Sequence, residues 1–375
     1  MPFLATRLML VTVGWLALQT FQGIPTGTAA WEIMSNGKVG PVKLLSPRAY
    51  PFVNMWSRWD AGWYYSVAKD GYKFVPGQQS NTAFFPTYPL AMRILRTIVR
   101  GRTALSYFAS GIIISNLALL GALAYLMRLI ELDADRATAA RAALYVLAFP
   151  TTLFFSAVFT ESMFLLTAVA AFYYARKERW LLAGLCGALA TLTRSPGILL
   201  CLPLALEYLA QRKFDWRKIR PDLLALALIP AALAGLMLFF HARVGNMLAT
   251  RDAQAAWGGN WGTLHGPWFP FFEMAQRHLL AHEWVDIAFT ILALLLSIWA
   301  ACSLRLSYGV YAVLCYLFHT SWGSLESMPR YILAIFPVFI VLAVWGRNEL
   351  FHRAYLIIGS GLAAIFMLEF ALWRW

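Results

Sequence analysis

Long apolar runs separated by short polar stretches make up most of the chain. The hydrocarbon core of a bilayer is about 30 Å thick, so a helix needs about 20 mostly apolar residues to cross it. The runs that reach or approach this length predict about 10 to 11 membrane-spanning helices. They cover residues 5–23, 104–127, 142–159, 162–176, 180–194, 197–210, 222–241, 285–303, 307–320, 331–346 and 354–373. The pattern therefore predicts an all-α polytopic membrane protein in which residues 1–375 form a single membrane-embedded domain.

Residues 24–103, between the first two apolar runs, show a different, amphipathic pattern. At about 100° per residue, a helix over residues 56–72 gathers aromatic side chains on one face, with Asp60 among them. A second amphipathic helix follows residues 84–90, and both helices are expected to lie in the membrane interface. An unpaired charge is costly in such surroundings, so Asp60 needs a partner or a function.

The composition supports a membrane protein and indicates its orientation. Hydrophobic residues make up 60% of the chain and charged residues 13%, against roughly 25% charged residues in soluble domains. The net charge of +13 comes from basic residues that collect in short loops between the apolar runs. Loops of this kind face the cytoplasm, and they give no reason to expect nucleic acid as a partner. The basic loops fall within residues 128–141, 176–179, 212–220 and 347–353.

This orientation places residues 24–103 in the first outer loop, together with residues 193–197, 242–284 and 319–330. The unusual polar residues gather on the same side, at the outer ends of apolar runs or in outer loops. They include carboxylates, arginines and aromatic residues, which suit a phosphorylated lipid carrier that bears a sugar. Arginines bind phosphate oxygens, and a carboxylate can deprotonate a hydroxyl.

Short motifs are spread in order along most of the chain. They are Arg58-Trp-Asp-Ala-Gly-Trp-Tyr64 with Val67-Ala-Lys-Asp-Gly-Tyr72, Phe84-Phe-Pro-Thr-Tyr-Pro-Leu90, Phe149-Pro-Thr-Thr-Leu-Phe-Phe-Ser156 with Thr160-Glu-Ser162, Ala190-Thr-Leu-Thr-Arg-Ser195, Ala253-Gln-Ala-Ala-Trp257 and Pro329-Arg-Tyr331. Together they resemble the motifs of one family, the PIG-V relatives of GPI mannosyltransferase 2. The length is closer to that of prokaryotic members.

The resemblance implies a GT-C type glycosyltransferase. Such enzymes take a sugar, usually mannose, from a polyprenyl-phosphate or dolichyl-phosphate carrier. They transfer it with inversion to a hydroxyl of a lipid-linked or glycolipid acceptor. The membrane would be the plasma or inner membrane of a prokaryote, with the active site facing outward, or the endoplasmic reticulum with a luminal site in a eukaryote.

The same resemblance assigns roles to individual residues. Asp60 matches the catalytic carboxylate of the first outer loop, and we expect Arg194 and Arg330 to bind the donor phosphate and carrier. Other residues are expected to line the substrate cavity, namely Glu161, Gln254, Trp257, Arg58, Glu326 and Tyr331. Many GT-C enzymes carry a pair of acids in this loop, whereas here Asp60 stands alone. We therefore expect no metal and no other cofactor, although a divalent metal stays open.

Each of these residues also has a purely structural interpretation. Asp60 is a favoured N-cap for the helix that follows it, and Glu161 can cap the next apolar run. Arg194 lies where a helix dipole favours a cation. Arg330 can pair with Glu326 four residues earlier on one helix face.

Two other classes of function stay open. A flippase or transporter for lipid-linked sugars would share the cationic cavity, but transporters place ionisable groups near the midplane and often contain inverted repeats. The chain could also be a non-catalytic subunit of a membrane glycosylation complex that has kept the fold.

Overall fold

The computed structural model describes residues 2–21, 28–33, 39–101, 103–258, 262–276 and 278–374. Within these ranges, five helices are long and apolar enough to cross a membrane. A sixth span results if two short helices, bent by 87° relative to each other, count as one. The five are Pro2–Thr20 (α1), Ala104–Ile130 (α5), Pro221–Val244 (η5 with α10), Ala281–Ser303 (α13) and Glu349–Ala371 (α17). The bent pair is Met328–Ala334 (α15 with η6) and Phe336–Trp345 (α16).

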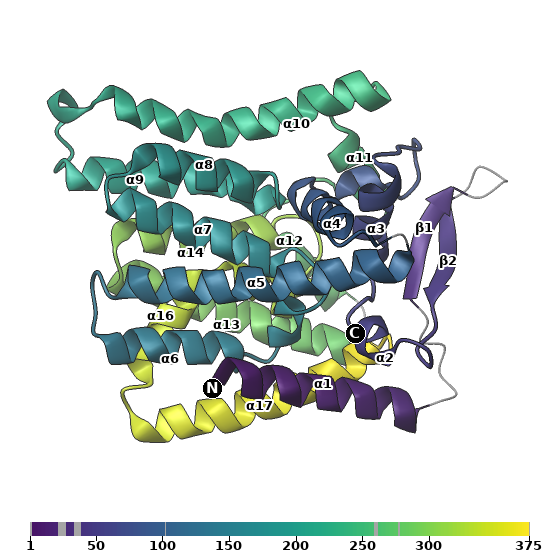
Figure 1. The fold of residues 1–375 in the computed structure, drawn as a ribbon. Coiled ribbons are helices and arrows are strands. Elements are labelled where there is room, and N and C mark those ends of the chain that lie inside the picture. The colour runs from purple at the N-terminus through teal and green to yellow at the C-terminus, as the bar shows by residue number, and fades with distance from the viewer. Residues whose placement is uncertain are drawn as a thin grey trace.

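Shorter helices lie alongside these and complete the bundle (Figure 1). The sequence pattern predicted most of them as spans, but only the helices named above meet the length and hydropathy expected of a complete crossing. The shorter bundle helices are Arg136–Leu147 (α6), Glu161–Arg176 (α7), Trp180–Thr191 (α8), Cys201–Gln211 (α9) and Leu306–Thr320 (α14). Residues 22 and 23 of the predicted first span lie outside the described residues.

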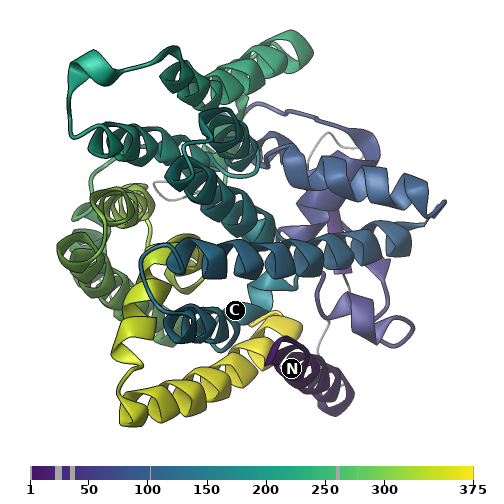
Figure 2. The ribbon, with the colours of Figure 1, turned by 60° about the vertical axis from the view of Figure 1, so that its left-hand side comes forward.

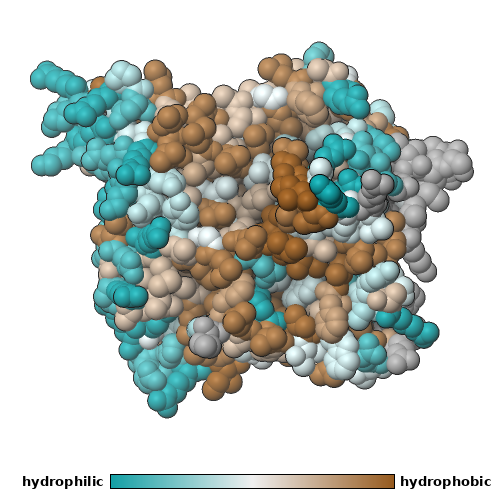
Figure 3. Space-filling model, in the orientation of Figure 1, coloured by the Kyte–Doolittle hydropathy of each residue, from teal (hydrophilic) through white to brown (hydrophobic). Residues whose placement is uncertain are grey.

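The bundle has two chemically different ends, as the alternation of the loops predicts. Its helices run back and forth along one direction, horizontal in Figure 1. The turns after α5, α7, α9 and α16, which hold the basic loops, lie at the left-hand end in this view. Hydrophilic side chains gather there in Figure 3, and apolar side chains are prominent across the middle of this face. The segments predicted to be outer lie at the opposite end, seen also from the side in Figure 2.

The predicted span 142–159 is wrong, because α6 ends at Leu147. Pro150 disfavours helical backbone in the residue before it, and the chain continues through Thr152–Phe155 (η2), a single 3₁₀ turn. Non-helical backbone inside a membrane protein needs partners from the protein itself. Arg7 of α1 donates to the carbonyl of Thr152 at 3.1 Å, so a buried arginine stabilises this break.

Residues 24–103 contain a β-hairpin that the all-α prediction missed. Strands Thr28–Ile33 (β1) and Val39–Leu45 (β2) pair antiparallel. Short elements follow, namely Pro51–Asn54 (α2), Ala61–Asp70 (α3), Asn81–Ala83 (η1) and Thr87–Ile98 (α4).

The predicted helix over residues 56–72 is shorter than expected, since α3 begins only at Ala61. Trp59 has a φ of 48°, a left-handed conformation that interrupts the helix before α3. Its neighbours on α3 are buried from Ala61 to Ala68, so α3 lies inside the protein and not in the membrane interface. α4 does expose apolar side chains such as Ile94 and Ile98, as expected of an interfacial helix.

The remaining elements are short. They are Ser195–Leu200 (η3), Trp216–Lys218 (η4), Ala249–Ala255 (α11) and Phe269–Ala275 (α12). α11 and η3 border the cavity described next.

Candidate active site

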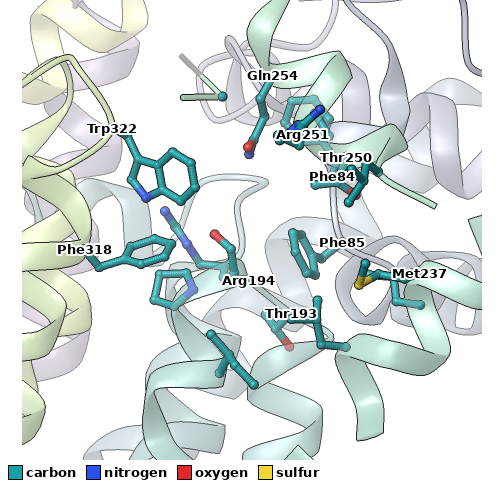
Figure 4. Close-up of a pocket in the computed structure, with 18 of the residues that line it drawn as sticks. Phe84, Phe85, Thr193, Arg194, Met237, Thr250, Arg251, Gln254, Phe318 and Trp322 are labelled. Atoms are coloured by element: carbon teal, nitrogen blue, oxygen red, sulfur yellow. The ribbon is translucent and has the colours of Figure 1, made fainter. Parts of the chain in front are cut away.

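A cavity of about 390 Å³ opens at the end of the bundle that carries the predicted outer segments (Figure 4). One part of its wall is polar, and the other part is apolar. The polar wall includes Asp60, Arg194, Arg251, Gln254, His319, Trp322, Arg330 and Tyr331. The apolar wall includes Phe85, Ile198, Leu233, Leu236, Met237 and Phe240, contributed in large part by α10.

Four charged side chains at the cavity form one connected chain of ion pairs, whereas Arg251 pairs with Asp252. Arg330 donates to a carboxylate oxygen of Asp60 at 2.9 Å. The Nε of Arg330 lies 3.3 Å from Oε1 of Glu161, and Arg194 pairs with that same oxygen. Glu161 thus bridges both guanidinium groups, and two carboxylates balance two arginines. The bridging side chain is only 3% exposed, against 26% for Asp60.

Aromatic rings hold both arginines in place. The guanidinium groups of Arg194 and Arg330 lie 5.5 and 5.1 Å from the centre of the Tyr331 ring. Arg330 also lies over Phe154 and Phe159, at 5.6 and 5.3 Å. Contacts of this length between a cation and an aromatic face are attractive. They fix two cations at the polar wall of the cavity.

Asp60 occupies the N-cap position of α3, but its carboxylate does not cap the helix. Within the described residues this side chain makes no capping hydrogen bond and turns to Arg330 instead. The backbone carbonyl of Asp60 accepts from Trp63 and Tyr64 at 3.0 and 3.1 Å, so the helix begins correctly without the carboxylate.

Burial, reinforced by the nearby carboxylates of Asp60 and Glu161, raises the pKa of Tyr64, which keeps this cavity hydroxyl protonated.

A tight turn between α8 and η3 places Arg194 at the cavity. The backbone of Arg194 is extended, and its carbonyl accepts from Gly197 at 3.0 Å. A Cβ atom at Gly197 would lie 2.2 Å from the nitrogen of Thr191 and 2.4 Å from the carbonyl carbon of Ala190. Only glycine allows the two segments to approach this closely.

Glu161 and Arg330 do not make the purely structural contacts considered for them, a helix cap and a pair with Glu326. Glu161 is the first residue of α7, and its carboxylate pairs with the arginines. Arg330 pairs with Asp60 and Glu161 and not with Glu326. Glu326 is exposed and lines a separate cavity of about 180 Å³ near Glu283 and Asp286.

Three further residues predicted to line the cavity are not among its lining residues. One is Glu161, whose buried carboxylate pairs with Arg194 and Arg330. Arg58 is fully buried, and its guanidinium donates to Asn54 Oδ1 at 2.6 Å and to the carbonyl of Ala371 at 3.0 Å. It ties the segment before α3 to the end of α17. Trp257 packs behind the wall, with ring centres 5.4 Å from Trp63 and 5.9 Å from Phe84, a cavity residue.

The structure adds cavity residues that the sequence reasoning did not select, His319 and Trp322 among them. Their only signal in the sequence is their place at the outer end of the predicted span 307–320. Among the described residues, no group of three or more His, Cys, Asp or Glu side chains has a geometry that could hold a metal ion.

Comparison with known proteins identifies the family of the chain. The chain is an integral membrane protein whose apolar helices surround a cavity lined by a carboxylate and arginines, and the family model described as mannosyltransferase (PIG-V) matches residues 9–243. It belongs to the PIG-V mannosyltransferase family, which confirms the resemblance seen in its motifs. A search of curated proteins found no match.

Solved structures similar to this chain are those of an oligosaccharyltransferase from Archaeoglobus fulgidus. The apo form is 14% identical, with 98% of this chain and 56% of that chain covered and a TM-score of 0.48. The same archaeal enzyme, AglB, in complex with an inhibitory peptide and a dolichol-phosphate is 13% identical, with 98% and 55% covered and a TM-score of 0.44. This chain spans about half the length of those enzymes.

Proposed function

We propose that the protein transfers a hexose, with mannose as the expected sugar, from a polyprenyl-phosphate carrier to a hydroxyl of a lipid-linked or glycolipid acceptor. The observation that carries this proposal is the contact of Asp60 with Arg330, continued through Glu161 to Arg194. Asp60 is thereby held beside Arg330 and is linked through Glu161 to Arg194, at a cavity that apolar side chains also line.

Transfer is a single inverting displacement at the anomeric carbon. Asp60 takes the proton of the acceptor hydroxyl as its oxygen forms the new bond to that carbon. The bond between the anomeric carbon and the phosphate oxygen breaks, and the electron pair leaves with the lipid phosphate. Arg194 and Arg330 stabilise the charge that develops on the leaving phosphate. Since Arg330 contacts Asp60 directly, base and leaving-group site lie a few ångströms apart.

The apolar wall suits the lipid part of the donor. Leu233, Leu236 and Met237 of α10 line the cavity, and the next turn of that helix exposes Leu238 and Phe239. An isoprenoid chain that follows α10 out of the cavity would pass from these apolar side chains to the lipid tails of the membrane.

No metal is required in this proposal. The lipid monophosphate that leaves carries less charge than a nucleotide diphosphate, and two guanidinium groups can neutralise it. We therefore expect the same rate of transfer in the presence of EDTA as with added Mg²⁺ or Mn²⁺. A rate that falls with EDTA and returns with one of these ions would overturn this part of the proposal.

The function is tested by transfer in detergent. Purified protein is incubated with radiolabelled polyprenyl-phosphate-mannose and a panel of glycolipid acceptors. We expect Asp60→Asn to lose about 10²–10⁴-fold in turnover, the usual contribution of a general base. Asp70→Asn serves as the matched control, because Asp70 closes the same helix and lies near the exposed Lys69 and Lys73.

The two variants separate the possible outcomes. Full activity of Asp60→Asn would remove Asp60 from the mechanism. Equal losses in Asp60→Asn and Asp70→Asn would point to damage to the helix and not to chemistry. Movement of the labelled lipid across vesicle membranes without any sugar transfer would favour a transporter.

A further inference from the structure

Two ring nitrogens in the wall of the cavity have no hydrogen-bond partner within the described part of the chain. They are Nε2 of His319 and Nε1 of Trp322, and both atoms are buried. Buried polar atoms in proteins are nearly always hydrogen-bonded, and an unsatisfied one needs an explanation. The proposed mechanism uses neither nitrogen, since proton transfer and phosphate binding fall to other residues.

The imidazole of His319 is fixed beside the two arginines. It is 6% exposed, and its ring lies flat on that of Tyr331, with centres 4.3 Å apart and an angle of 10° between the planes. The Tyr331 ring also contacts the guanidinium groups of Arg194 and Arg330. One aromatic ring therefore places the histidine next to the cations that would hold the phosphate.

The indole of Trp322 belongs to the same part of the wall. It meets the ring of Phe318, the neighbour of His319 in the chain, with centres 5.5 Å apart. Figure 4 shows Trp322 and Phe318 on the left side of the cavity, opposite Phe85 and Met237, with Arg194 between the two sides. The indole of Trp322 thus lies across the cavity from Phe85 and Met237.

The hydrogen-bonding capacity of the two rings indicates what they bind. An indole N–H can only donate, whereas a neutral imidazole offers one donor and one acceptor nitrogen. A phosphate would need donors alone, and two guanidinium groups already supply them. A sugar hydroxyl donates and accepts at once, so it can satisfy either ring.

We propose that His319 and Trp322 form the subsite that recognises the hexose, with each ring nitrogen hydrogen-bonded to a sugar hydroxyl. This inference rests on the proposed function and specifies how the donor sugar is selected. A site built to hydrogen-bond a hydroxyl discriminates strongly against an analogue that lacks it, because its own polar group is then left unsatisfied.

The test pairs changes in the protein with changes in the sugar. Wild type, Trp322→Phe and His319→Phe are assayed with polyprenyl-phosphate-mannose and with donors that each lack one hydroxyl. Phenylalanine keeps a ring in place for packing but removes the nitrogen. We expect each variant to lose about 10–100-fold in kcat/KM with the complete sugar, because one sugar hydroxyl is then left without its hydrogen-bond partner.

The distinguishing result is coupling between one ring and one hydroxyl. For each ring, one deoxy donor lacks the hydroxyl that the ring nitrogen binds. With that donor, wild type and the variant at that ring should have the same kcat/KM. Two such donors are expected, one for each ring. His319→Gln should recover part of the activity that His319→Phe loses, because the amide nitrogen of glutamine can reach the position of Nε2. Trp284→Phe, at an exposed tryptophan of α13, is the control and should behave as wild type.

Two outcomes would overturn the inference in different ways. If removal of each hydroxyl lowers kcat/KM by the same factor in the variants as in wild type, the two ring nitrogens do not bind the sugar hydroxyls. The protein would still be a transferase. If wild type transfers no hexose from any polyprenyl-phosphate donor, the proposed function fails and the subsite fails with it.

Discussion

At the scale of single residues, Glu161 is the residue on which the charge balance of the site depends. Its buried carboxylate pairs with Arg194 and Arg330 at once. Removing one member of a buried ion pair leaves an uncompensated charge and usually costs about 3–5 kcal/mol. We expect Glu161→Gln to lower the thermal stability in detergent. We also expect kcat/KM to fall about 10²-fold, because the two guanidinium groups lose the geometry that aligns the phosphate.

Glu326→Gln is the matched control for this prediction. The sequence placed Glu326 in the same cavity, but the structure places it, exposed, in a separate one. It should therefore leave both stability and transfer near the wild-type values. Loss of activity in Glu326→Gln equal to that in Glu161→Gln would mean that the ion-pair chain ending at Asp60 is not the centre of the site.

The structure brings three of the charged residues selected from the sequence to one cavity, but not Arg58 or Glu326. Asp60, Arg194 and Arg330 come from distant parts of the chain and lie at one cavity, because topology alone brings the outer ends of spans together. Arg58 stands two residues from Asp60 in the same motif, yet its partner is the carbonyl of Ala371. That contact depends on where the last helix ends, which no local pattern reveals.

At the scale of elements, the turn between α8 and η3 is the most constrained part of the site. Gly197→Ala would force a Cβ atom against the backbone of Thr191 and Ala190. We expect the substitution to move η3, displace Arg194 and lower both thermal stability and transfer. Gly235→Ala in α10 is the control, because no described atom lies within 4 Å of a Cβ there. Alanine also favours a helix over glycine by about 1 kcal/mol, so this variant should be neutral or slightly more stable.

Equal destabilisation by the two glycine variants would show that the close approach at Gly197 has no special role. The stability of both glycine variants is measured by thermal unfolding in detergent, and their transfer activity is then measured on the folded fraction.

The helix boundaries that the sequence missed share one physical cause. Periodicity predicted one helix over residues 56–72, but tertiary contacts of Arg58 and the left-handed Trp59 end that regularity before α3. Residues 142–159 are mostly apolar, yet Pro150 and the side chain of Arg7 stabilise a non-helical path. Hydrophobicity detects burial, and it does not distinguish a buried helix from a buried loop whose backbone other side chains satisfy.

At the scale of the whole molecule, the alternation of basic loops predicted which segments share an end of the bundle. The structure confirms this arrangement, with the cavity at the end opposite the basic loops. The β-hairpin was not predicted, because its strands of six and seven residues lack a long alternating pattern. The apolar runs and basic loops thus indicate how the spans alternate, whereas the hairpin depends on the pairing of β1 with β2.

The face of the membrane on which the cavity opens follows from charge and can be measured. Loops rich in arginine and lysine stay in the cytoplasm, so the opposite end, with Asp60, should face outward. The test places a single cysteine at each end in a protein whose native cysteines are replaced. Glu131→Cys lies in the turn after α5, and Glu273→Cys lies in α12, and both positions are exposed glutamates.

We expect a membrane-impermeant thiol reagent to label Glu273→Cys in intact cells and Glu131→Cys only after permeabilisation. Because both substitutions remove one glutamate, they change the charge of each loop equally and leave its basic residues in place. The reverse labelling would put Asp60 on the cytoplasmic side, where soluble nucleotide sugars are available. The proposed lipid-phosphate donor would then lose its topological support, and the assay for transfer would have to begin with nucleotide-linked hexoses.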